Sequence, residues 1–236
     1  MSNKYFEFKK FTIHQDRCAM KVGTDGTLLG AWASAPTQSR YILDIGTGTG
    51  LIALMMAQRY PEAQIVGIDI DDAAVAQATE NVAASPFAER ISILKQDVTT
   101  YKPELQFDAI VSNPPYFVDS LTCPDEQRSI ARHTVTLTFE ALIKSAYRLL
   151  KTEGTFSVVI PTEMRSKLEA YARLEGFFIS KVCCIKTTPK KPSKRQLIEF
   201  TKAPVKELVI SEGILETSPN TRSDWYQKLT NDFYIR

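Results

Sequence analysis

Four consecutive residues near the middle of the chain have the chemistry to hold a planar nitrogen compound. Asn113, Pro114, Pro115 and Tyr116 directly follow an apolar run at 107–112, which predicts a buried strand. Two prolines end that strand, because neither offers an N–H group to a neighbouring strand, and they stiffen the backbone. The strand end therefore presents a carboxamide, a rigid turn with backbone carbonyl groups and an aromatic ring. An amine or amide nitrogen needs that set, with acceptors for its N–H groups and a face to stack on.

Chemistry at this turn would favour attack by an exocyclic amine such as the adenine N6 group. That nitrogen is a poor nucleophile, because its lone pair is delocalised into the ring. The Asn113 side-chain oxygen and the Pro114 carbonyl can accept its two N–H groups and build charge density on it, while Tyr116 stacks on the base. Group transfer is then an in-line displacement that needs orientation more than a strong base, and the base must first leave its stack. We predict that Asn113, Pro114 and Tyr116 are catalytic.

A glycine-rich turn follows the first predicted strand and opens the first helix. Gly46, Gly48 and Gly50 are spaced GxGxG, not the GxGxxG that places a pyrophosphate at a helix N-terminus. Asp44 precedes them, and a negative charge there suits a cofactor with a sulfonium and an α-ammonium group. The turn therefore predicts S-adenosylmethionine, with Asp44 at its methionine end, directly or through water, and Asn113 beside its reactive methyl group.

Two further acids are predicted at the ends of the next two strands. Asp69 lies about 20 residues beyond the glycine loop, where an acid can bind both ribose hydroxyls. Asp97 can accept a hydrogen bond from the adenine amino group, and Ile70 and Val98 can sandwich the ring. Asp69 could instead cap the next helix, although Asp71 and Asp72 are better placed for that, and Asp97 could be an ordinary loop acid. Ligands bind at the carboxyl ends of strands in open α/β sheets, which favours the cofactor interpretation.

The elements that must position these residues alternate along the chain. Strands are predicted at 41–45, 64–70, 91–94, 107–112, 155–160, 177–186 and 196–201, and helices at 51–60, 71–84, 138–150 and 161–174. This alternation predicts an α/β fold with a mostly parallel sheet, in which the last two strands pair antiparallel because no helix separates them. We expect one domain, 1–236, with a core at 41–201, an N-terminal extension at 1–40 and a C-terminal extension at 202–236. Thr24 or Asp25 is expected to cap a helix in the first extension, and the N-terminus of that helix is expected to pack near the cofactor.

Several of these blocks together resemble one family, the bacterial tRNA1(Val) adenine-37 N6-methyltransferases. The blocks are 8–11 with 16–32, 44–50, 113–116, 132–134, 194–200 and 232–234, so the resemblance covers essentially the whole chain. The 20–32 block separates this family from other enzymes with an Asn-Pro-Pro-Tyr turn. The resemblance implies the seven-stranded, Rossmann-like fold of class I methyltransferases. It also implies methyl transfer from S-adenosylmethionine to N6 of the adenine just 3′ of a tRNA anticodon.

Local charge must carry any contact with RNA, because the formal net charge is only +2 and the pI is near 8.3. The connection at 186–195 carries five positive charges, no acid and two stiffening prolines. A segment at 128–133 could form a lid over the substrate. The alternative for 186–195 is a solvated basic loop, and the alternative for 128–133 is a loop packed on its own domain. We predict RNA contacts at Arg128, Arg132, His133, Lys190, Lys191, Lys194 and Arg195.

Composition indicates the location of the protein and whether it binds a metal. No apolar run resembles a signal peptide or reaches the roughly 20 residues of a membrane span, so a cytoplasmic protein without membrane contact is expected. The four cysteines form no CxxC pair, which disfavours a metal site. We expect tRNA as the partner, without a metal or an obligate protein partner.

Other activities fit parts of this pattern. Glutamine N5-methylation of a protein could use the same turn, but such enzymes resemble this one only in the core and carry an N-terminal helical domain. N6-methylation of another RNA remains open. DNA adenine methylation would need a target-recognition domain, and no segment here is large enough for one. Enzymes that methylate guanine N2 more often have Phe after the prolines, where this chain has Tyr116. A non-catalytic RNA-binding protein would have no need of the set Asp44, Asp69, Asp97 and Asn113.

Overall fold

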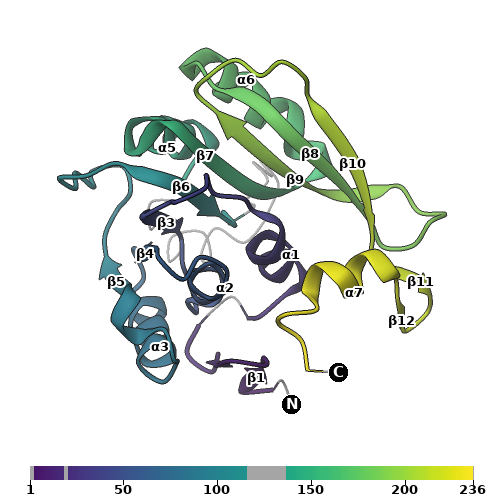
Figure 1. Cartoon of the computed structure of the whole chain (residues 1–236), viewed down its shortest axis with the longest axis horizontal. Coiled ribbons are helices and arrows are strands. Elements are labelled where there is room, and N and C mark those ends of the chain that lie inside the picture. Colours follow the sequence, from purple (N-terminus) through teal and green to yellow (C-terminus); the bar gives the residue numbers. More distant parts are fainter. Residues whose placement is uncertain (1–2, 19–20, 116–136, 236) are drawn as a thin grey trace, which may run out of the picture.

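A mostly parallel sheet of eight strands forms the centre of the computed structural model, which describes residues 3–18, 21–115 and 137–235 (Figure 1). The strand order is β10-β8-β9-β7-β6-β3-β4-β5. β9 pairs antiparallel with both β7 and β8, and every other pair is parallel. The bounds are β3 (Tyr41–Ile45), β4 (Gln64–Asp69), β5 (Ile91–Lys95), β6 (Phe107–Ser112), β7 (Leu150–Pro161), β8 (Phe178–Lys186), β9 (Ser193–Thr201) and β10 (Val209–Ile214).

The fold class is confirmed, but the predicted count of seven strands is one too few. The eighth strand is β10, which comes from the C-terminal extension and pairs parallel with β8, with Val209 opposite Lys181. Its sequence mixes apolar, polar and glycine residues, because an edge strand has little to bury: Val209 and Ile210 are 53% and 64% exposed. A weak apolar pattern of that kind does not predict a strand by itself.

Helices cover both faces of the sheet, and successive side chains of a strand point to opposite helix layers. Ile42 of β3 belongs to the core under α1 (Thr24–Trp32), α2 (Leu51–Arg59) and α3 (Asp72–Ala83). Its neighbour Leu43 belongs to the core under α5 (Phe139–Leu149) and α6 (Arg165–Glu175). In Figure 1, α5 and α6 accordingly lie on the opposite side from α1 and α2. Because both faces are covered, the central strands are nearly continuous apolar runs.

Helix ends follow the expected capping rules with two exceptions. Asp71 caps α3 by accepting from the Ala73 N–H at 3.0 Å, and Thr138 caps α5. Neither Thr24 nor Asp25 caps α1, because the capping position is occupied by Gly23, which has no side chain that could accept a hydrogen bond. The helix expected from Pro161 begins only at Arg165, since Pro161 still belongs to β7 and Thr162–Met164 forms a 3-10 turn, η2.

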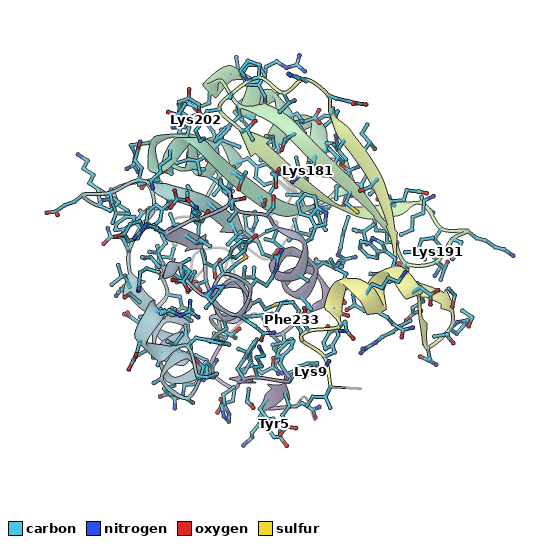
Figure 2. The ribbon with its side chains drawn as sticks, in the orientation of Figure 1. Tyr5, Lys9, Lys181, Lys191, Lys202 and Phe233 are labelled. Atoms are coloured by element: carbon cyan, nitrogen blue, oxygen red, sulfur yellow. The ribbon has the colours of Figure 1, made fainter. Side chains whose placement is uncertain are left out.

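The two chain extensions pack against each other and against the sheet's helices. The N-terminal extension forms β1 (Tyr5–Glu7) and β2 (Thr12–His14), while the C-terminal one adds β11 (Glu216–Ser218), β12 (Thr221–Arg222) and α7 (Asp224–Thr230). The Phe8 and Tyr234 rings stack at 5.7 Å, and the Lys9 N–H donates to the Phe233 carbonyl at 2.8 Å. Figure 2 shows Lys9 and Phe233 near each other in the lower half of the molecule. Phe8 and Phe233 are buried in the same core as α1 and α2.

Candidate active site

The glycine loop between β3 and α2 has a backbone that other residues rarely adopt. Gly46, Gly48 and Gly50 have φ values of 72°, 55° and 81°. Such positive φ values strain residues that carry a Cβ, so the three glycines are required by the shape of the turn. The N–H groups of Gly46 and Thr47 both donate to the Ile68 carbonyl, at 2.9 and 3.0 Å, which fixes the loop to the end of β4.

Two adjoining cavities lie above this loop, at the carboxyl ends of the strands. One, of about 220 Å³, is lined by residues that end β3, β4 and β5, among others. The other, of about 330 Å³, is lined by the start of α1, the loop and the start of α2, among others. Gly46, Gly48 and Asn113 line both cavities, so the two form one groove. We call its parts the strand-end half and the helix half.

Asp69 lies in the strand-end half, where the sequence predicts a ribose contact. Its Oδ2 accepts from the Gly48 N–H at 2.9 Å, and its Oδ1 accepts from the Asp71 N–H at 3.1 Å. Asp71, and not Asp69, caps α3. The Asp69 carboxylate therefore holds the glycine loop while bordering the groove.

The other residues predicted around adenine also line the strand-end half. Ile70 is 44% exposed, whereas Val98 is 4% exposed. Asp97 uses Oδ1 to accept from the Thr99 N–H at 2.8 Å and from the Thr99 hydroxyl at 2.7 Å. Its second carboxylate oxygen is therefore the one that can serve a ligand. A planar group in this half would meet apolar side chains and acids together.

Cys18 is a member of this half that sequence reasoning did not assign to the site. Its side chain is 7% exposed, as expected for a buried cysteine, yet it borders the groove. Burial, and then the charges of Asp69 and Asp71, raise the pKa of its thiol to about 11. The thiol therefore stays protonated and acts as a small apolar wall. No motif could have indicated this, since only the folded N-terminal segment brings Cys18 here.

Asn113 is placed at the junction of the two halves, and Pro115 lines the strand-end half. Pro114 between them is buried. The preceding residue, Ser112, donates from its hydroxyl to the Ile45 carbonyl at 2.9 Å, which ties the end of β6 to the end of β3. Tyr116, Arg128, Arg132 and His133 lie outside the described residues, and their predicted roles stay predictions.

Asp44 lies beneath the glycine loop, and it is not among the residues that line the groove. Its side chain is fully buried, and its Oδ2 accepts from the Thr47 hydroxyl at 2.7 Å and the Ala53 N–H at 3.1 Å. Its Oδ1 is buried without a hydrogen bond among the described atoms. Burial raises the pKa of Asp44 to about 7, against smaller downward effects of the Thr47 and Ala53 hydrogen bonds. The geometry thus offers no direct contact between Asp44 and a ligand.

The helix half brings the start of α1 to the glycine loop, as expected, and adds Arg195, which the sequence did not assign to this site. Thr24, Asp25 and Gly26 of the first turn of α1 line it, and so does Arg195 at the start of β9. Arg195 forms an ion pair with Asp25. The Arg195 side chain, predicted to contact RNA, is 40% exposed, and the Asp25 side chain is 20% exposed. The N-terminus of α1 carries a partial positive charge and backbone N–H groups, which suit a ligand carboxylate.

The basic connection joins β8 and β9 as an antiparallel hairpin, as expected. Lys190, Lys191 and Lys194 are exposed on it. Figure 2 shows Lys191 at the outer end of this hairpin, away from the sheet. Lys186 pairs with Glu212 of β10, which leaves fewer uncompensated charges than the sequence alone suggested. Among the described residues, no group of three or more His, Cys, Asp or Glu could hold a metal ion. No helix in the described part of the chain is long and apolar enough to span a membrane.

The fold and the groove define a class I S-adenosylmethionine-dependent methyltransferase. A predicted O-methyltransferase from Agrobacterium tumefaciens superposes with a TM-score of 0.68 over 89% of this chain and 96% of its own, at 21% identity. The ribosomal protein L11 methylase from Lactobacillus delbrueckii gives a TM-score of 0.54 over 76% of this chain and 77% of its own, at 18% identity. At such identities the likeness shows the fold.

Sequence relatives then give the family. The methyltransferase small domain model matches residues 24–188. The tRNA1(Val) (adenine(37)-N6)-methyltransferase of Bacteroides thetaiotaomicron is 51% identical over 100% of this chain and 99% of its own length. The relative of the same name from Yersinia pestis is 43% identical over 98% of this chain and 93% of its own. The chain belongs to the tRNA1(Val) (adenine(37)-N6)-methyltransferase family.

Proposed function

We propose that this protein transfers a methyl group from S-adenosylmethionine to N6 of adenine 37 in a tRNA1(Val)-like tRNA. The observation that carries the proposal is the position of Asn113, which borders both halves of the groove. A cofactor that fills the groove would place its sulfonium between the halves, beside this amide.

The strand-end half fits the adenosine part of the cofactor. Asp69 would bind the ribose hydroxyls with its carboxylate, and Ile70 and Val98 would contact the two faces of adenine. Asp97 would accept from the adenine amino group. All four residues line one cavity of about 220 Å³, with Cys18 as a further wall. Apolar surface with a few directed polar groups is typical of a cofactor site.

The helix half fits the methionine part. The α1 N-terminus would bind the methionine carboxylate, and Arg195 would hold the first turn of α1 in place through Asp25. Asp44 would act from beneath the loop, where its ionised form favours a cationic ligand through space. Gly46 and Gly48 line the groove and let the cofactor approach the loop backbone closely, whereas Gly50, predicted for the same role, lies outside the groove lining and faces Ala78 of α3.

At the reacting centre, Asn113 and the Pro114 carbonyl would accept the two N–H groups of the target amine, and Tyr116 would stack on the base. These residues would orient the nitrogen against the methyl group. The bound cofactor would supply the methyl group and leave as S-adenosylhomocysteine, and the methylated N6 would lose one proton. The base must be flipped out to reach the groove, so we propose that RNA contacts surround it. Lys190, Lys191 and Lys194 are the described residues proposed for this role, together with Arg128, Arg132 and His133.

The chain is proposed to act as one domain of 236 residues without a metal or an obligate protein partner. Burial of Phe8 and Phe233 in the core of the sheet supports a single domain, because the extensions share that core. A tRNA substrate would place the protein in the cytoplasm.

The test is mass spectrometry of tRNA nucleosides from cells with and without this protein, and from cells with the Asn113→Ala variant. We expect one oligonucleotide to lose its N6-methyladenosine both in the deletion strain and with the variant. An unchanged set of tRNA fragments in the deletion strain would refute the tRNA substrate. Incubation with labelled cofactor and total cell protein then tests the alternative, since a methylated glutamine in a protein would favour N5-methylation.

A further inference from the structure

Asn81 of α3 makes a set of buried hydrogen bonds that none of the roles above explains. Its side chain is fully buried. The Nδ2 group donates to the Thr49 carbonyl at 2.8 Å and to the His14 carbonyl at 2.9 Å. The Oδ1 atom accepts from the His14 N–H at 2.8 Å. One amide therefore joins the glycine loop to β2 of the N-terminal extension.

The contact with Thr49 completes a regular pattern in the loop. Three consecutive loop residues are each held by a side chain from a different element. The Thr47 hydroxyl donates to Asp44 of β3 at 2.7 Å, and the Gly48 N–H donates to Asp69 of β4 at 2.9 Å. Thr49 is held by its carbonyl oxygen, which needs a donor, and a carboxylate cannot supply one. Asp44 and Asp69 also accept from backbone N–H groups close to the loop, whereas Asn81 reaches a distant segment, β2 of the N-terminal extension.

The segment on the other side of Asn81 forms a wall of the groove. His14 ends β2, and four residues later Cys18 lines the strand-end half. The segment has a second anchor on the same helix, because the Oε1 of Gln77 accepts from the Arg17 N–H at 3.2 Å. Gln77 is 1% exposed and lies one helical turn before Asn81, but its hydrogen bond to Arg17 reaches only the N-terminal segment. Asn81 and Gln77 are thus two buried amides of the same helix that both hold the N-terminal segment, but only Asn81 also bonds to the glycine loop.

We propose that Asn81 is a positioning residue that sets the cofactor loop and couples it to the N-terminal wall of the groove. Loss of the amide leaves the Thr49 carbonyl and both backbone groups of His14 without their partner, which costs more than a solvent-exposed hydrogen bond. The loop then shifts relative to Asp69 and Asp44, and cofactor affinity falls. The inference rests on the proposed cofactor site.

The experiment compares Asn81→Leu with Gln77→Met, which are close in volume to the native side chains. Binding of S-adenosylhomocysteine is measured by calorimetry on folded protein, and KM and kcat are measured with S-adenosylmethionine and tRNA. We expect Asn81→Leu to weaken S-adenosylhomocysteine by at least about tenfold and to raise the cofactor KM more than it lowers kcat, and Gln77→Met to change affinity by less than about threefold. Equal losses in the two variants would overturn the role of Asn81. A wild-type protein that does not bind the ligand would instead overturn the proposed function.

A measurement on the unmodified protein covers the case in which Asn81→Leu does not fold. Hydrogen exchange of the His14 amide is followed with and without saturating S-adenosylhomocysteine. That N–H bonds to Asn81, and His14 does not line the groove. We expect exchange there to slow by about tenfold when the loop is occupied, with the amides of β10 as an unaffected reference. Unchanged exchange at His14, together with measured ligand binding, would contradict the coupling.

Discussion

The two halves of the groove are built on different principles. The strand-end half is made largely by residues at the tips of β3, β4 and β5, so its members follow one another at regular intervals along the chain. The helix half joins the start of α1 to the start of β9, and Asp25 and Arg195 meet there as an ion pair. Neighbouring parallel strands bring their ends together by topology, whereas the helix half depends on how an extension packs. The first half is therefore readable from spacing, whereas for the second the sequence indicated only the start of α1.

Asn113 belongs to both halves, so its substitution should have the largest effect on catalysis. We expect Asn113→Ala to lower kcat by about 10²–10³-fold, because the amine loses an acceptor at the reacting atom. Affinity for S-adenosylhomocysteine should stay within about tenfold of wild type. Single-turnover kinetics and calorimetry separate the two effects. A collapse of cofactor binding with unchanged single-turnover rate would move Asn113 from the substrate to the cofactor.

Asp69 tests the strand-end half, where one carboxylate serves the loop and is proposed to bind the ribose. Asp69→Ala removes the bond from Gly48 and the ribose contact together, so we expect affinity for S-adenosylhomocysteine to fall by about 30-fold or more. Asp71→Ala is the matched control, because it removes the helix cap and should act mainly on stability. Equal cofactor affinities in the two variants would argue against Asp69 as the ribose ligand.

Arg195 tests the helix half and separates two roles for one residue. If the ion pair with Asp25 positions α1, Arg195→Gln should weaken cofactor binding by about tenfold and leave the salt dependence of tRNA binding nearly unchanged. Lys194→Gln is the neighbouring control and should show the reverse. A reduced salt slope with normal cofactor affinity would return Arg195 to the RNA contacts predicted from sequence.

Asp44, beneath the glycine loop that both halves share, should make the stability of the protein depend on pH. Its pKa is about 7 in the folded protein, raised mainly by burial. A raised carboxyl pKa contributes stability that is fully present below the unfolded pKa and is lost as pH rises through about 7. Asn cannot titrate, so the unfolding temperature of Asp44→Asn should fall less than that of wild type between about pH 5 and about pH 8. Parallel curves for the two proteins would place the Asp44 pKa outside this window.

The cationic cofactor gives the same carboxyl a second signature. Because a sulfonium favours the ionised form, wild-type affinity for S-adenosylmethionine should rise by several-fold between about pH 6 and about pH 7.5. Asp44→Asn should show a flat profile and weaker binding at the upper end. Calorimetry at three pH values in that range makes the comparison, and identical profiles would show that Asp44 does not sense the cofactor.

The smallest effect is expected at the outer end of the basic hairpin. Lys190 and Lys191 are exposed there, so replacing both with Gln should weaken tRNA binding by a few-fold and lower the salt slope by about 1–2. Cofactor affinity should not change, since neither residue lines the groove. An unchanged salt slope would exclude this hairpin end as an RNA contact.

Much of this protein could be determined from the sequence alone. The alternation of strands and helices predicted that β3 to β7 are parallel, because a helical connection between two strands returns the chain to the same edge of the sheet. Asp69, Ile70, Asp97, Val98 and Asn113 were expected at one edge of the sheet, and the structure brings them to one groove. This succeeded because a residue's place at a strand end fixes its place in space once the strands are parallel.

Only the tertiary structure decided the rest. The eighth strand, the burial of Asp44 and the entry of Cys18 into the groove depend on contacts between segments far apart in the chain. The pairing of Arg195 with Asp25 and the bridge from Asn81 to His14 are of the same kind. A single sequence carries no periodic signal for such contacts, because they arise from the packing of the extensions on the sheet and not from the local preference of either segment.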